Sequence, residues 1–253
     1  MGTLSVVGLG PGAEDLLTPR ARRALERAQA IVGYERYTGL VRRWLPSAPL
    51  YAYPIGAEVE RVRQALRLAA ELERVALVCS GDAGVYGLAG LVFELRALME
   101  WPQGPPAVEV IPGITAATAA AALLGAPLGH DFAAVSLSDL LTPWDVIVRR
   151  LEAVAAADFV IALYNPASAA RRHRLDEARV LLLRHRAPET PVGIVTNAER
   201  EGQQVVVTTL GELPTQAVGM LSIVIVGNTQ TRVEDGRLVT PRGYRLGDAP
   251  PPQ

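Results

Sequence analysis

One short stretch combines the residue types that a small-molecule site needs. Residues 80–87 read SGDAGVYG, so three glycines, a carboxylate and an aromatic ring follow an apolar run. Glycine permits positive φ and lets the backbone approach a ligand closely, because it carries no Cβ. Asp82 either accepts hydrogen bonds from a ligand amine or caps the helix that follows, and these residues alone leave both roles open.

A second glycine stretch resembles a dinucleotide site. Gly8, Gly10 and Ala13 fit the GxGxx(G/A) pattern, and Glu35 follows at about the twenty-residue distance typical of a ribose-binding carboxylate. A nicotinamide-dependent oxidoreductase is therefore one alternative function. Against it, Thr18 before Pro19 predicts that the helix begins only there, so a pyrophosphate would lack a helix N-terminus beside the glycines.

The composition excludes several other chemistries. None of the 253 residues is lysine, so all 25 basic residues are arginine, and a P-loop lysine or a Schiff-base lysine is impossible. The single Cys79 excludes an intrachain disulfide and a CxxC pair. The three histidines form no HExxH motif, so we expect no metal site. A net charge of −1 argues against a nucleic-acid partner.

The N-terminal residues and the apolar runs predict where the protein works. The first residues lead directly into a predicted strand without a basic region, and no apolar run approaches ~18 residues. We therefore expect a cytoplasmic protein with no membrane partner.

The first half of the chain alternates between predicted strands and helices. Apolar runs at residues 4–7, 30–33, 75–79 and 108–111 predict strands, and three of them, 4–7, 75–79 and 108–111, end in a glycine turn that opens toward a helix. This alternation is typical of a parallel sheet, whose ligand sites lie at the carboxyl ends of the strands. Residues 58–74 predict an amphipathic helix, with Val59, Val62 and Leu66 facing inward and its arginines and glutamates facing solvent.

The second half predicts a different lobe. Glycine and proline cluster at residues 125–131, so we expect an N-terminal lobe at 1–128 and a C-terminal lobe at 129–242. A basic helix is expected at residues 169–186. The strands expected at 192–196, 204–209 and 222–226 have no helices between them, which predicts a mixed sheet. The proline-rich residues 243–253 predict a flexible tail. The expected class is therefore α/β, with two lobes.

Four separated segments together resemble the tetrapyrrole methyltransferases, which use S-adenosylmethionine. They are VGLGPG at residues 7–12, GD at 81–82, PGITA at 112–116 and SIVIVG at 222–227. Residues 81–87, 130–132, 136–144 and 163–168 further resemble the branch that methylates C17 of precorrin-3B or cobalt-factor III, with ring contraction, in cobalamin biosynthesis. Alternatives within the family are methylation of another corrin carbon and a diphthine synthase-like reaction.

The resemblance implies a homodimer whose cofactor lies in a cleft between the two lobes, with the Gly10, Pro11 and Gly12 loop on the tetrapyrrole side. Carried over by motif, the cofactor-binding residues would be Asp82, Ala83, Gly84, Val85, Tyr86, Thr115, Ala116, Tyr164, Asn165, Asn197 and Ala198. In this setting a ligand role for Asp82 becomes the favoured one.

Ring contraction also needs proton transfer, and the substrate carries many carboxylates. The candidate catalytic residues are the polar ones near the lobe junction, His130, Ser136, Ser138 and Asp139, with Asp131 beside them. The alternative is that the two aspartates only terminate elements. Arginine grips carboxylates bidentately, which makes Arg36, Arg171, Arg172 and Arg200 candidates for substrate binding, although Arg171 and Arg172 also fit a solvated helix face.

Overall fold

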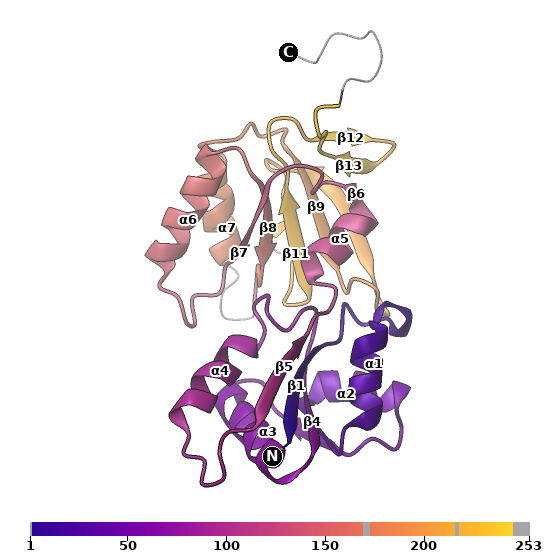
Figure 1. Ribbon diagram of the computed structural model, residues 1–253. Helices are drawn as coiled ribbons and strands as arrows, with labels where there is room; N and C mark the ends of the chain where they lie inside the picture. Colours follow the sequence, from indigo (N-terminus) through magenta and orange to yellow (C-terminus); the bar gives the residue numbers. More distant parts are fainter. Residues whose placement is uncertain (1, 169–172, 216–217, 245–253) are drawn as a thin grey trace. The chain divides into compact units, whose positions relative to one another are not determined.

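The computed structural model describes residues 2–168, 173–215 and 218–244 (Figure 1). The chain divides into two compact units, Met1–Ala116 and Ala117–Gln253. The division falls earlier than the expected junction at residue 128, because helix α5 (Ala116–Leu124) packs on the C-terminal sheet. A Cβ on Gly193 of that sheet would lie only 2.4 Å from Leu124 Cδ1.

The N-terminal unit contains a five-stranded sheet in the order β3-β2-β4-β1-β5. Every neighbouring pair in it is parallel, as the alternation of strands and helices predicts. The central strands are buried on both faces, since each has a helix layer on either side. The strands are β1 (Thr3–Gly8), β2 (Ala30–Tyr34), β3 (Leu50–Tyr53), β4 (Arg74–Cys79) and β5 (Ala107–Ile111).

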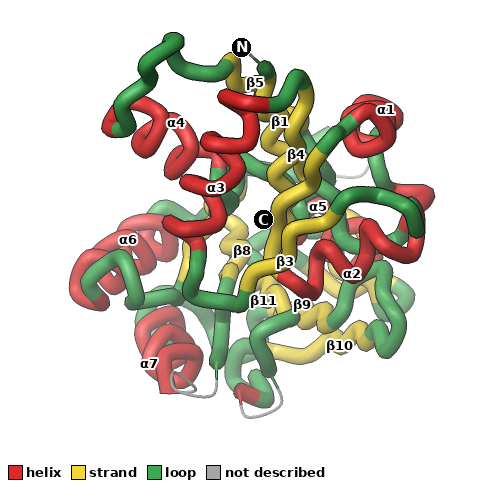
Figure 2. The backbone as a smooth tube through the Cα atoms, turned by 90° about the horizontal axis from the view of Figure 1, so that it is seen from below, coloured by secondary structure: helices red, strands yellow, loops and turns green. Residues whose placement is uncertain are grey.

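Helices cover both faces of this sheet (Figure 2). One core lies against α1 and α2, and a second core lies against α3 and α4. Thr18 caps α1 as the sequence predicts, since its hydroxyl accepts from Ala21 N at 3.2 Å and Pro19 is the first helical residue. The helices are α1 (Pro19–Arg27), α2 (Glu35–Trp44), α3 (Glu58–Glu71) and α4 (Ala89–Leu98), and a 3-10 turn η1 spans Glu14–Leu16.

Helix α3 departs from the predicted amphipathic pattern at two residues. Val59 is 47% exposed, although it was expected to face inward. Arg61 was expected in solvent, but it is buried, because it shares one helix face with Ala65 and Ala69 at a spacing of four residues. The buried face of α3 is therefore apolar except at its start, where the charged side chain of Arg61 lies.

The C-terminal unit contains a mixed five-stranded sheet in the order β10-β9-β11-β8-β7, as predicted. Strands β7 and β8 are parallel, whereas β11 runs antiparallel to both β8 and β9. The strands are β7 (Phe132–Ser136), β8 (Val160–Tyr164), β9 (Pro191–Thr196), β10 (Gln204–Thr209) and β11 (Ser222–Val226), and a small second sheet joins β6 (Gly125–Ala126), β12 (Arg232–Glu234) and β13 (Arg237–Val239).

Helices α6 (Trp144–Ala156) and α7 (His173–Leu182) cover one face of the mixed sheet through a shared core. Helix α7 ends at Leu182, before the end predicted at residue 186. Residues 169–172 of the predicted helix and residues 245–253 of the predicted tail lie outside the described residues. Within the described part of the chain, no helix combines the length and apolar character needed to cross a membrane.

Candidate functional site

The carboxyl ends of the N-terminal strands bring three loops together. All five strands run in the same direction, so the loops after β1, β4 and β5 lie at one edge of the sheet. Gly10 and Gly81 exchange two backbone hydrogen bonds, of 3.0 and 2.8 Å. The structure therefore joins the glycine stretch expected to face the substrate to the one expected to bind the cofactor.

Three glycines are required by this junction itself. A Cβ on Gly8 would lie 2.7 Å from the carbonyl oxygen of Gly81, and a Cβ on Gly113 would lie 2.2 Å from the same oxygen. Gly81 adopts a φ of +64°, which favours glycine. The close packing of three chain segments explains these residues without a ligand.

Asp82 ties two of the loops to each other. Its Oδ1 accepts a hydrogen bond from Gly84 N at 2.7 Å, and its Oδ2 accepts one from Gly113 N at 2.9 Å. It does not cap α4, because that helix begins at Ala89 with Leu88 as its N-cap. Asp82 thus fixes the geometry of the loop. The remaining lone pairs of its carboxylate are free to accept a hydrogen bond from a ligand.

The rest of the 80–88 loop turns outward. Residues 84–87 are exposed, Tyr86 is 54% exposed and has a φ of +52°, and Val85 is 37% exposed. A Cβ on Gly84 would meet only Asp82 Oδ1, at 3.3 Å, among the described residues. Ala83 differs, since its side chain is fully buried in the core. Thr115, directly before α5, and Ala116, its first residue, are half-buried.

The predicted substrate-binding residues of this unit lie at the same edge. Gly10 and Pro11 are buried and Gly12 is half-buried in the loop after β1. Arg36 is exposed in the first turn of α2, directly after β2. Arg171 and Arg172 lie outside the described residues.

The C-terminal unit assembles a second set of predicted residues. Strands β7, β8 and β9 run in the same direction, because β11 is antiparallel to both β8 and β9. Their carboxyl ends therefore share one edge. There the Oγ of Ser136 accepts hydrogen bonds from Asn165 Nδ2 at 3.0 Å and from Ser138 N at 3.2 Å.

The neighbouring strand ends carry the other expected contacts. Tyr164 is buried, and its hydroxyl accepts from Ala117 N at 3.0 Å, so it anchors the start of α5. Asn165 and Asn197 both have positive φ, +50° and +53°, directly after β8 and β9. Ala198 and Arg200 are half-buried in the turn after β9.

Asp139 is held by an arginine that the sequence analysis missed. Arg174 donates to its carboxylate at 2.8 Å, and both side chains are 20% exposed. The same guanidinium lies 4.4 Å from the ring centroid of Trp144 and reaches Glu177 at 3.1 Å. Nothing in the sequence pairs Asp139 with a residue 35 positions away, so only the fold reveals this contact.

His130 and Asp131 do not join the Ser136 cluster. They precede β7, whereas Ser136 ends it, and six residues of extended strand span about 20 Å. His130 Nδ1 accepts from Asp131 N at 2.8 Å, and the two side chains are 45% and 78% exposed. The predicted catalytic set is therefore divided between the two ends of one strand.

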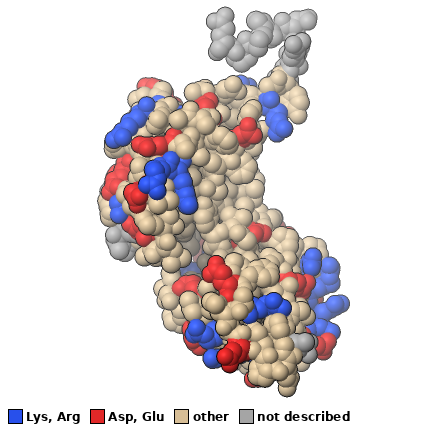
Figure 3. Space-filling model, turned by 60° about the vertical axis from the view of Figure 1, so that its left-hand side comes forward, with Lys and Arg blue, Asp and Glu red and all other residues tan. Residues whose placement is uncertain are grey.

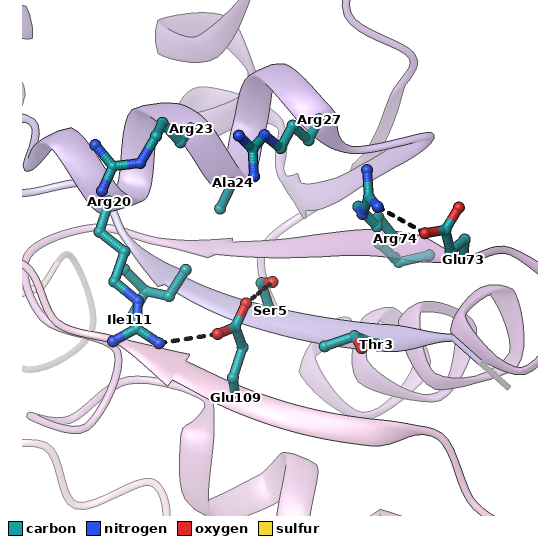
Figure 4. Close-up of a pocket in the computed structure, with 11 residues that line it drawn as sticks. Thr3, Ser5, Arg20, Arg23, Ala24, Arg27, Glu73, Arg74, Glu109 and Ile111 are labelled. Carbon is teal, nitrogen blue, oxygen red and sulfur yellow. Dashed lines mark hydrogen bonds and ion pairs between the residues drawn. The ribbon is translucent and has the colours of Figure 1, made fainter.

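A polar pocket of about 680 Å³ lies elsewhere on the N-terminal unit, between α1 and the sheet (Figure 4). Arg20, Arg23 and Arg27 of α1 face it, and none of the predicted site residues lines it. Glu109 there accepts from Ser5 Oγ at 2.6 Å and from Arg20 at 2.9 Å. The Ser5 hydroxyl is the largest cause of a lowered pKa of Glu109, and Arg20 adds to the effect.

Among the described residues, neither the surface charges nor the potential metal ligands form a further candidate site. On the face shown in Figure 3, arginine and acidic side chains alternate over the surface. Among the described residues, no three His, Cys, Asp or Glu side chains are grouped to hold a metal ion. The dinucleotide interpretation of the Gly8–Ala13 stretch fails on geometry, because a 3-10 turn follows it and α1 begins only at Pro19.

Comparison with known proteins identifies the family. Residues 3–214 match the family described as Tetrapyrrole (Corrin/Porphyrin) Methylases. The chain is 47% identical to a probable cobalt-factor III C(17)-methyltransferase of Salmonella typhimurium, over 96% of this chain and 100% of that protein. It is 44% identical to a cobalt-factor III methyltransferase of Priestia megaterium, over 96% of this chain but only 45% of that protein, so it spans about half of that relative.

Solved structures agree with the sequence relatives. The crystal structure of the methyltransferase CobJ has a TM-score of 0.89 and 38% identity, over 95% of this chain and 100% of that one. A uroporphyrin-III C-methyltransferase from Thermus thermophilus, solved with S-adenosylhomocysteine, has a TM-score of 0.65 and 28% identity, over 89% of this chain and 92% of that one. The chain belongs to the tetrapyrrole (corrin/porphyrin) methylase family.

Proposed function

We propose that the protein transfers the methyl group of S-adenosylmethionine to C17 of precorrin-3B or cobalt-factor III, with ring contraction, in cobalamin biosynthesis. The observation that carries this proposal is the 47% identity to a probable cobalt-factor III C(17)-methyltransferase over its whole length. The 38% identity and TM-score of 0.89 to CobJ support the same reaction class.

The cofactor would bind at the carboxyl edges described above. In the N-terminal unit, the exposed backbone of Gly84, Val85 and Tyr86 offers amides and carbonyls, and Asp82 holds this loop in place. Thr115 and Ala116 belong to the neighbouring loop end. In the C-terminal unit, Asn165 and Asn197 provide amide side chains at the ends of two strands.

The bound cofactor supplies an electrophilic methyl group on a sulfonium. A nucleophilic carbon of the reduced macrocycle would accept that methyl group, and the electrons of the carbon–sulfur bond would remain on sulfur in neutral S-adenosylhomocysteine. Such a displacement depends on alignment more than on a strong base. The fixed loop geometry around Gly81 and Asp82 fits that demand.

Ser136 has a defined role in this proposal. A serine oxygen has two lone pairs and one proton, and both lone pairs of Ser136 are engaged by Asn165 and Ser138. Its O–H therefore acts as a donor toward the macrocycle. Asp139 is neutralised by Arg174 and serves to hold the 137–144 loop. We assign His130 no proton-transfer role with Ser136, because it lies at the other end of β7.

We further propose that the enzyme is a cytoplasmic homodimer that recognises the carboxylates of its substrate through Arg36. The family resemblance supports the dimer. The one cysteine of the sequence is buried as a free thiol, which fits a reducing compartment. Arg36 is exposed at the loop edge of the N-terminal unit.

Titration calorimetry with S-adenosylhomocysteine tests cofactor binding at this edge. We expect the wild-type protein to bind it, and Gly84→Ala to weaken binding at least tenfold, because the added methyl group lies 3.3 Å from Asp82 Oδ1 and occupies space beside the exposed backbone of the loop. The fold of Gly84→Ala should be unchanged, since Gly84 has no positive φ. His130→Ala is the matched control and should bind as the wild type does. Absence of binding by the wild-type protein would refute the proposed function.

A further inference from the structure

The polar pocket between α1 and the N-terminal sheet occupies a strand face that should be apolar. Strands inside a parallel sheet are normally apolar on both faces, because helices cover them. Strand β1 lies between β4 and β5, yet on the side of α1 it carries Thr3 and Ser5, both half-buried. The next residue on that face, Val7, is fully buried in the core. The first half of this strand face therefore meets an open space of about 680 Å³, a size typical of small-molecule sites.

Arginine is the commonest residue type around this space. Arg20, Arg23 and Arg27 follow one another at three and four residues on α1, so they share one helix face. In Figure 4 they lie along one side of the pocket, and Ser5 and Glu109 lie along the other. Among the described residues, four arginines and two glutamates line the pocket, which gives its walls a formal charge of +2.

Each of the two glutamates is matched by one arginine. The pairs are Arg20 with Glu109 at 2.9 Å and Arg74 with Glu73 at 2.6 Å. The other two arginines, Arg23 and Arg27, have no hydrogen bond or ion pair with any residue that the structure describes. The excess positive charge of the pocket therefore belongs to two guanidinium groups of α1 that can bind an anion from solution.

Glu109 determines which part of the pocket can accept that anion. The Ser5 hydroxyl and Arg20 both donate to its carboxylate and lower its pKa, so the carboxylate stays negative. A second anion beside it would be repelled. The anionic groups of a ligand therefore belong nearer Arg23 and Arg27.

The lining of the pocket indicates the class of ligand. Guanidinium groups bind phosphate and carboxylate oxygens bidentately. Arg23 and Arg27 are four residues apart, about 6 Å along the helix axis, which suits two linked anionic groups better than one small ion. The described lining residues include no aromatic side chain on which a purine or a macrocycle could stack. The ligand is therefore compact, mostly polar and at least doubly charged.

We propose that this pocket binds a compact polyanion with two or more phosphate or carboxylate groups, which Arg23 and Arg27 hold together. The site is separate from the proposed methyl-transfer site. Ser5 lies three residues, or about 10 Å, before Gly8 at the carboxyl end of β1. The inference therefore goes beyond the proposed function and does not depend on it.

Titration calorimetry at low ionic strength tests the site with two probes, sodium tripolyphosphate for phosphate groups and citrate for carboxylates. We expect the wild-type protein to bind at least one of them, and the double variant Arg23→Gln/Arg27→Gln to lose affinity by about tenfold or more. Arg22→Gln is the matched control, because Arg22 lies on the same helix but pairs with Glu14 and Glu26 and does not line the pocket. It should bind the probes with an affinity within about twofold of the wild type.

Thermal unfolding provides a second readout of the same variants. Arg23 and Arg27 are exposed, so without a probe the double variant should melt as the wild-type protein does. A saturating probe should raise the melting temperature of the wild-type protein and of Arg22→Gln, but not that of the double variant.

The outcomes separate a site from a merely basic surface. Tighter binding of tripolyphosphate identifies phosphate as the recognised group, and tighter binding of citrate identifies carboxylate; either supports the site. No binding of either probe, or unchanged affinity in the double variant, overturns the inference. Equal losses of affinity in the double variant and in Arg22→Gln overturn it in favour of a nonspecific attraction of anions to the helix.

Discussion

Asp82 shows how one side chain can serve the fold and the site together. The sequence left two roles open, a helix cap and a ligand contact, and the structure adds a third: its two oxygens join the loops after β4 and β5. A carboxylate that accepts backbone N–H groups is fixed in orientation, and any ligand amine would meet it already in place. Residue type alone did not reveal this, because Gly113 is 31 positions away.

Cys79 makes a measurable contribution to the pH dependence of stability. Burial raises the pKa of its thiol from 9.0 to about 11, although the Leu88 backbone and Arg61 oppose the shift. The unfolded chain therefore ionises first as pH rises. Stability from this group is complete below pH 9 and is lost between pH 9 and about 11, at about 1.4 kcal/mol per pH unit.

Urea unfolding at pH 8, 9, 10 and 11 measures this effect when the wild-type protein is compared with Cys79→Ala. The variant will be less stable overall, since it leaves a small cavity, but the difference between the two proteins should shrink by about 2–3 kcal/mol toward pH 11. Tyrosines titrate in both proteins, so their contribution cancels. A pH-independent difference would show that the thiol is not held neutral by burial.

At the scale of elements, the strand pattern was predictable and the partners of the polar residues were not. Apolar runs with glycine turns predicted the parallel sheet of the N-terminal unit, because strands buried on both faces are apolar throughout. Strand β3 was missed, since it is a half-exposed edge strand of only four residues. Helix α2 was missed because it follows β2 without a turn signal.

The residues of the candidate site show the same difference: their positions at strand ends were predictable, and their side-chain partners were not. Motif position placed Gly81, Asp82 and Asn165 at strand ends, where the structure has them. The contacts of Arg174 with Asp139 and the burial of Arg61 depend on packing between elements, which local sequence does not encode. Arg61 carried one usable signal, its spacing of four and eight residues from Ala65 and Ala69 on the buried face of α3.

Arg186 is a buried arginine that stabilises the end of one helix, α6. Its guanidinium donates to Ala155 O at 2.6 Å, in the last turn of α6, and pairs with Asp158 at 3.2 Å. Its Nη1 and Nη2 both have carbonyl acceptors, whereas its Nε has no hydrogen-bond partner among the described residues. It therefore holds the C-terminus of α6 against the segment that follows α7.

Arg186→Met should lower the free energy of unfolding by about 1–3 kcal/mol, because the carbonyl of Ala155 loses its buried donor and Asp158, which is 38% exposed, loses its ion pair. Arg184→Met is the control, since Arg184 is 67% exposed and lies 3.9 Å from Glu152, and it should cost less than about 1 kcal/mol. Thermal and urea unfolding report both values. Equal stabilities of the two variants would contradict the assignment of Arg186 as the anchor of α6.

At the scale of the whole molecule, each unit carries most of its described candidate residues at the carboxyl ends of strands that run in one direction, whereas His130 precedes β7. The N-terminal unit provides the Gly81, Asp82 and Gly84 loop, and the C-terminal unit provides Ser136 and Asn165. Membership of the tetrapyrrole methylase family indicates that this geometry serves methyl transfer onto a tetrapyrrole. The relatives named for cobalt-factor III restrict the proposed methylation position to C17.

The most direct test is the mass of the product formed from a defined macrocycle. The protein is incubated with S-adenosylmethionine carrying a deuterated methyl group and with either precorrin-3B or cobalt-factor III, and the products are analysed by mass spectrometry. We expect one of the two macrocycles to gain a single labelled methyl group, which nuclear magnetic resonance places at C17. A labelled methyl on another carbon, or no transfer to either macrocycle while S-adenosylhomocysteine still binds, would contradict the proposed C17 methylation.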